Sequence, residues 1–127
     1  AYTMNNLGFI ANRRGDLAEA ERLYRECLAI LREVGDRRAE AVLMNNLGDI
    51  TRIRGDLAEA EQFNRDSLAI MRQVGYRDGE ATSLQNLGKI ASENGKMDEM
   101  HEYYTEAVRI RREIGIPIQQ WFIDNGY

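Results

Sequence analysis

The chain has 127 residues, of which 43% are hydrophobic and 30% are charged, a composition that is typical of a folded chain and argues against disorder. It has one cysteine and one histidine, which excludes an internal disulfide and a cysteine-based zinc site, and no apolar run approaches the roughly 18 residues that span a bilayer. The net charge of -4 disfavours a nucleic-acid-binding surface, so neither nucleic acid nor a membrane is expected as a partner.

The sequence repeats with a period of 40 residues. Residues 1–40 and 41–80 are identical at 24 positions, and residues 81–120 keep 10 identities with the second unit. A period between roughly 20 and 50 residues is typical of solenoids, propellers and arrays. We expect one repeat domain over 1–127, as part of a longer protein, with units at 1–40, 41–80 and 81–116 and a capping helix over 117–125.

Each unit is predicted to contain two helices separated by a glycine. Apolar residues recur at steps of three and four residues in both segments of every unit, as on one face of a helix. Asp16 and Asp56 each follow a glycine, which fits a helix end succeeded by the cap of the next helix. Lys96 stands at the same place in the third unit, so this helix start lacks the acidic cap.

A glycine recurs inside the first helix of every unit, at Gly8, Gly48 and Gly88. Glycine inside a helix costs about 1 kcal/mol relative to alanine, so we expect the partner helix to approach too closely for a side chain. The expected partners are the small residues of the second helices, namely Ala20, Ala60, Cys27, Ser67 and Ala107.

Leu7-Gly8, Ala20, Tyr24 and Cys27, at these spacings, resemble the tetratricopeptide repeat, a helix–turn–helix unit. The period of 40 is similar to the extended repeats of leucine-glycine-asparagine-type scaffolds, kinesin light chains and bacterial regulators. The resemblance implies an all-α fold, a right-handed superhelical solenoid of three helix hairpins plus a short C-terminal capping helix. It also implies a protein–protein interaction module, without enzymatic activity or a cofactor, that binds a peptide or protein segment in a concave groove lined by the first helices.

The chain departs from the family pattern at two positions of the second helices. Asn64 stands where an aromatic residue is usual, and Met100 stands where alanine is usual. We therefore expect the packing to differ locally in the second and third units.

The helix wheel identifies the residues that would project from the open side of the first helices. These candidate ligand-binding residues are Asn5, Asn6, Phe9, Arg13, Asn45, Asn46, Asp49, Arg52, Gln85, Asn86 and Lys89. Asparagine recurs at one position of this side, at Asn6, Asn46 and Asn86, although it is a poor helix former, roughly 0.7 kcal/mol below alanine. The resemblance implies that this asparagine ladder holds the backbone of a bound peptide. The alternative is that the amides bond to the neighbouring helix and only pin the stacking.

Charges on the open side are mixed in sign. Three basic residues, Arg13, Arg52 and Lys89, would attract an acidic ligand. The carboxylates of Asp49 and Glu93 would weaken this attraction. Family members that clamp a C-terminal carboxylate have lysine at the place of Asn5, and none of the three units has a lysine there. A clamp for a terminal carboxylate is therefore disfavoured.

No catalytic or metal-binding residue is expected. Cys27 and His101 lie two units apart, which excludes a Cys–His pair, and Cys27 fits a small buried core residue. Trp121 and Phe122 are expected to cover the third unit or to mediate self-association with another chain. The favoured function is a cytoplasmic protein-binding scaffold in signalling, and the alternative is an internal regulatory or spacer segment of a larger signalling ATPase or transcriptional regulator.

Overall fold

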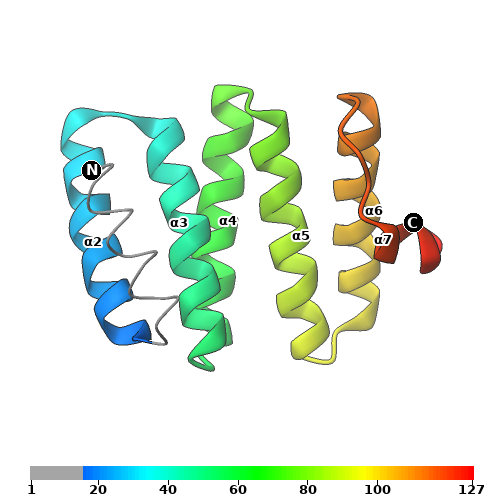
Figure 1. Ribbon diagram of the computed structural model, residues 1–127, viewed down its shortest axis with the longest axis horizontal. Coiled ribbons are helices and arrows are strands. Elements are labelled where there is room, and N and C mark those ends of the chain that lie inside the picture. Colours follow the sequence, from blue (N-terminus) through cyan, green and yellow to red (C-terminus); the bar gives the residue numbers. More distant parts are fainter. Residues whose placement is uncertain (1–15) are drawn as a thin grey trace.

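A computed structural model describes residues 16–127, which fold into helices joined by short turns and one irregular segment. Labelled as in Figure 1, these are α2 (Leu17–Val34), α3 (Arg37–Ile53), α4 (Leu57–Val74), α5 (Arg77–Glu93), α6 (Met97–Glu113) and α7 (Gln120–Asp124). Figure 1 shows α2 to α6 standing side by side, each antiparallel to the next along the chain. None of the helices within 16–127 is long and apolar enough to cross a membrane.

Glycine and aspartate set the helix boundaries, as the sequence predicts. The side chain of Asp16 accepts a hydrogen bond from the Glu19 backbone N–H at 3.0 Å, and Asp56 caps α4 in the same way. Gly35 ends α2 in the left-handed conformation with φ 81°, and Asp36 caps α3, which is a cap that the sequence analysis missed. Because α3 begins at Arg37, the unit boundary drawn after residue 40 falls inside the first turn of this helix.

Gly48 and Gly88 lie against the second helix of their own hairpin, but their main contacts are not the expected small residues, and Gly8 lies outside the residues that the structure describes. A Cβ placed on Gly88 would come within 2.6 Å of Tyr104 Cδ1. A Cβ on Gly48 would meet the side chain of Asn64 and would also lie 3.3 Å from the Ala60 carbonyl oxygen. The close approach was correctly expected, but the space left by the missing side chain is occupied by Asn64 and Tyr104, which stand at the aromatic position of the repeat.

Neighbouring hairpins share one apolar core. Helix α3 packs against α2, α4 and α5, and α5 packs against α4 and α6 as well. Leu28 of α2, Leu47 of α3 and Met71 of α4 belong to the same buried cluster, which shows that the first helix of each hairpin also fills the space beside the preceding hairpin. Burial of this stacked surface stabilises the array, since one hairpin cannot cover its own apolar stripe.

The last helix, α7, begins later than the sequence suggests. The expected start at residue 117 lies in the irregular segment 116–119, and α7 begins only at Gln120, after Gln119 with φ -59° and ψ 138°. Proline disfavours the helical conformation of the residue before it, which here is Ile116. Phe122 is 3% exposed and packs edge-on against Tyr104, whereas Trp121 is 52% exposed.

Candidate protein-binding face

The predicted site residues divide between a described and an undescribed part of the chain. Asn5, Asn6, Phe9 and Arg13 lie outside the residues that the structure describes. The other seven lie on α3 and α5, which are the first helices of their hairpins and pack against each other. The described part of the candidate site is therefore built from two adjacent helices.

Asn45 does not project from the open side. Its side chain is 7% exposed, and its Oδ1 accepts a hydrogen bond from the Ser83 hydroxyl of α5 at 3.1 Å. The Ser83 hydroxyl also lies 3.3 Å from that of Ser67, which donates to the Ala41 carbonyl oxygen. The small Ser83 lets α5 approach α3 closely, so Asn45 is used inside the contact between hairpins.

Asn46 and Asn86, at the same position of successive units, have different surroundings. Asn86 donates from Nδ2 to Asn64 Oδ1 at 3.1 Å, and Asn64, 1% exposed, donates in turn to the Ala60 carbonyl at 2.9 Å. Asn86 thus makes the bond to a neighbouring helix that the stacking alternative describes. The Asn46 side chain is partly exposed and makes no hydrogen bond with any other residue of 16–127.

The charged residues of this face are partly compensated. Arg52 is 15% exposed and binds Asp49 at 2.8 Å and Glu93 of α5 at 2.9 Å. Burial alone lowers the pKa of Arg52, but the hydrogen bonds that it donates to Asp49 and Glu93, together with their negative charges, outweigh burial and raise the pKa above its usual value. Lys89 is exposed and pairs with no carboxylate in the described range. Among the predicted cations within 16–127, Lys89 therefore remains open to a ligand.

Arg111 of α6 contacts the predicted site residue Gln85 of α5, and the sequence analysis did not identify it. It hydrogen-bonds the Gln85 side-chain oxygen and lies 3.4 Å from the Thr82 hydroxyl, so Gln85 is held by the protein itself. The signal that could have found it is a charge at a core position, since Leu31 and Met71 occupy the equivalent places in the other units and are buried.

One strip of α3 keeps its side chains open. Val42 is 38% exposed and Ile53 is 49% exposed, and Asn46 and Asp49 lie between them at helical spacing on the same face. The Arg52–Glu93 pair joins this strip to α5, where Lys89 lies one turn before Glu93. We define the binding face as Val42, Asn46, Asp49, Ile53 and Lys89.

The binding face offers chemistry for recognising a polypeptide. An amide without a partner can both donate to and accept from a peptide group, an ammonium attracts a carboxylate, and two aliphatic side chains offer apolar contact. Within 16–127, no group of three or more His, Cys, Asp and Glu side chains is placed to hold a metal ion.

Stacked helix hairpins with a polar first-helix face define a helical repeat protein. The family model described as "Tetratricopeptide repeat" matches residues 1–73 and 52–113, so the chain belongs to the tetratricopeptide repeat family. No curated protein matches the chain.

Solved structures place the fold in the same class. BtubC (BKLC) from P. vanneervenii is similar with a TM-score of 0.82 and 22% identity, over 91% of this chain and 48% of that one. The TPR domain of Arabidopsis FLU is similar with a TM-score of 0.81 and 18% identity, over 89% of this chain and 94% of that domain. The chain spans about half the length of BtubC. The expected all-α superhelical solenoid of tetratricopeptide-type hairpins is thereby confirmed.

Proposed function

We propose that the chain is a non-catalytic, cytoplasmic scaffold that binds a protein segment along the concave groove of its first helices. Tetratricopeptide repeat domains mediate protein–protein interactions in general, and this supports the class of function. Asn46 holds the main chain of the segment, and Lys89 attracts a carboxylate on it.

The observation that carries this proposal is the contrast between Asn46 and Asn86. Both are asparagines at one repeat position, but within 16–127 only Asn86 is hydrogen-bonded to a neighbouring helix. A helix-destabilising residue that is partly exposed and has no partner in the described range is more easily explained by an external partner than by packing.

The test compares the two asparagines as a matched pair. A 12-residue peptide is first selected from a random display library on the intact chain, and its affinity is then measured for Asn46→Ala and Asn86→Ala by fluorescence anisotropy. We expect Asn46→Ala to weaken binding about five- to tenfold with little change in melting temperature, since one or two hydrogen bonds are lost.

Asn86→Ala is expected to lower the melting temperature because it leaves the buried Asn64 amide oxygen without its donor. If Asn46→Ala binds the peptide with unchanged affinity but melts at a lower temperature, the asparagine ladder has only a structural role. Lys89→Gln should weaken only those selected peptides that carry an acidic residue.

A further inference from the structure

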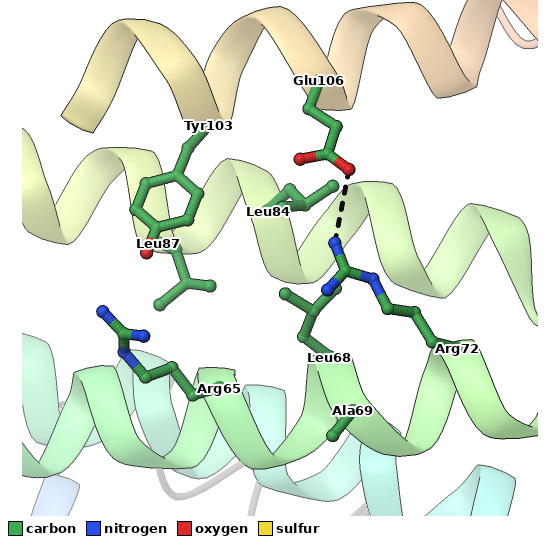
Figure 2. A pocket seen from close by; sticks show the side chains of 8 residues that line it. All are labelled: Arg65, Leu68, Ala69, Arg72, Leu84, Leu87, Tyr103 and Glu106. Atoms are coloured by element: carbon green, nitrogen blue, oxygen red, sulfur yellow. Dashed lines mark hydrogen bonds and ion pairs between the residues drawn. The ribbon is translucent and has the colours of Figure 1, made fainter. Parts of the chain in front are cut away.

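A pocket of about 340 Å³ opens between the second helices of two hairpins, α4 and α6, above one side of α5 (Figure 2). Its floor is apolar and consists of Leu68 of α4 together with Leu84 and Leu87 of α5. None of the residues of the binding face lines it. The pocket is therefore a feature separate from the face proposed above.

One end of the pocket is closed by an ion pair. Arg72 of α4 lies 3.3 Å from Glu106 of α6 and also 3.1 Å from Glu80, so its positive charge is compensated on two sides. Figure 2 shows this pair bridging the two helices over Leu84. A ligand would gain little from Arg72 without first displacing these carboxylates.

The other end keeps its polar groups available. Figure 2 shows the Arg65 guanidinium of α4 and the Tyr103 ring of α6 pointing toward one another beside Leu87. Within residues 16–127, Arg65 pairs only with Glu61 of its own helix, at 3.3 Å, and the two side chains are 51% and 32% exposed. The Tyr103 hydroxyl makes no hydrogen bond to any group within 16–127.

The preceding pair of hairpins fills the equivalent space differently. Arg25 of α2, which corresponds to Arg65, lies with Cζ 5.4 Å from the centre of the Phe63 ring and forms an ion pair with Glu59 of α4. The arginine there crosses between the helices and is used internally. The open arginine at Arg65 is thus particular to one junction and is not a property of every repeat.

We infer that this pocket is a second docking site, for a segment of a protein partner in which an apolar side chain stands next to a carboxylate. The argument is one of charge and shape. Arg65 and the Tyr103 hydroxyl are hydrogen-bond donors suited to a carboxylate, while the leucine floor accepts an aliphatic or aromatic side chain. The volume lies near the lower end of the range of about 300–1,000 Å³ for ligand pockets, which fits one or two side chains.

The test uses two blocked peptides, acetyl-Ser-Gly-Leu-Asp-Gly-Ser-amide and its twin with asparagine in place of aspartate. Binding to the intact chain is followed through the methyl NMR signals of Leu68, Leu84 and Leu87. We expect the aspartate peptide to bind about tenfold more tightly than its twin, since it adds a charge-assisted hydrogen bond. Arg65→Gln should remove this difference, and Ala69→Phe, which fills the pocket from its rim, should abolish the shifts.

Matched controls come from the preceding junction. Arg25→Gln and Ala29→Phe stand at the equivalent positions and should leave both peptides unaffected. Asn46→Ala should also have no effect, so failure of this site and failure of the binding face are separable. Should Ala69→Phe not fold, the comparison of the two peptides on Arg65→Gln still decides.

Two results would overturn the inference. The first is equal affinity of both peptides for the pocket, or shifts that Arg65→Gln leaves unchanged. The second is a set of methyl shifts that appear on raising the protein concentration alone and disappear in Ala69→Phe, because a second copy of the chain would then occupy the pocket.

Discussion

At the scale of single residues, Asn64 shows how the chain departs from a family position while its buried amide stays hydrogen-bonded. Tyr24 and Tyr104 hold the equivalent places and are buried aromatic residues, whereas Asn64 is a buried amide. A buried amide is tolerated only when it is hydrogen-bonded, and here Ala60 and Asn86 supply the partners. The asparagine at position 64 of α4 therefore gives Asn86 of α5 its hydrogen-bond partner.

The contact at Gly88 gives a prediction about stability. Gly88→Ala would push a methyl group against the Tyr104 ring, which Phe122 and Tyr127 hold in place, so we expect a loss of about 1–3 kcal/mol in the free energy of unfolding. Urea unfolding would measure it. Gly79→Ala serves as the comparison: its Cβ would come as close, 2.5 Å from Met71 Sδ and 2.8 Å from Tyr76 Cδ2, but the end of the Met71 side chain is flexible and helix propensity favours alanine, so we expect a smaller loss.

A reciprocal swap of Glu113 and Gln73 tests an ionic contribution. Hydrogen bonds from Arg77, and then from Arg109, lower the pKa of Glu113 below its usual value. The folded-state pKa is thus below the unfolded one, so its stabilisation is present above about pH 4.3 and is lost as the pH falls through the folded value. Glu113→Gln should lower the melting temperature at pH 7 and have no effect near pH 2.

Gln73 occupies the equivalent position in the second unit and accepts from Arg37 at 3.3 Å. Gln73→Glu should therefore add a pH-dependent stabilisation of the same sign, visible in thermal unfolding followed by circular dichroism from pH 2 to 7. Identical pH profiles for the natural chain and both variants would show that these exposed pairs contribute nothing.

At the scale of helices, most of the secondary structure could be predicted because apolar spacing and Gly-Asp pairs recur at 40-residue intervals. The start of α7 could not, because Pro117 is compatible both with a first helical turn and with extended backbone before a helix. In the structure Phe122 contacts Tyr104 from α7, and Ile118 packs against the same buried cluster from the irregular segment before the helix.

The start of α6 offers a stabilising change. Lys96 has φ -93° and ψ 74°, nearly the conformation of Asp56, but its side chain makes no capping hydrogen bond. Lys96→Asp should add this bond and raise the free energy of unfolding by about 1 kcal/mol, whereas Asp56→Ala should lower it by a similar amount. An unchanged melting temperature for Lys96→Asp would mean that Asp98 and Glu99 already satisfy this helix end.

Two neighbouring aromatic residues of α7 allow its packing role to be tested apart from a contact with another chain. Phe122→Ala removes a buried ring against Tyr104 and should cost about 3–5 kcal/mol. Trp121→Ala alters a half-exposed ring and should cost clearly less. Sedimentation velocity of both variants tests the expected self-association, and only a Trp121-dependent dimer would support it, because Phe122 is used inside the chain.

At the scale of the whole molecule, the sequence predicts which helices carry the candidate site but not how their side chains are used. A helix wheel assigns a face relative to the residue's own hairpin. It does not report what the next hairpin brings, and this is what buries Asn45 against Ser83 and pairs Arg52 with Glu93. The same limitation hid Arg111, whose role depends on the approach of α6 to α5.

Helix α5, which packs against α3, α4 and α6, is shared by both proposed sites. Lys89 belongs to the binding face, while Leu84 and Leu87 of the same helix form the floor of the pocket. A ligand that shifts α5 from one side therefore alters the surface presented on the other. By linkage, if the first ligand changes the affinity for the second by some factor, the second changes the affinity for the first by the same factor. Two partners bound at these sites would then be coupled through α5.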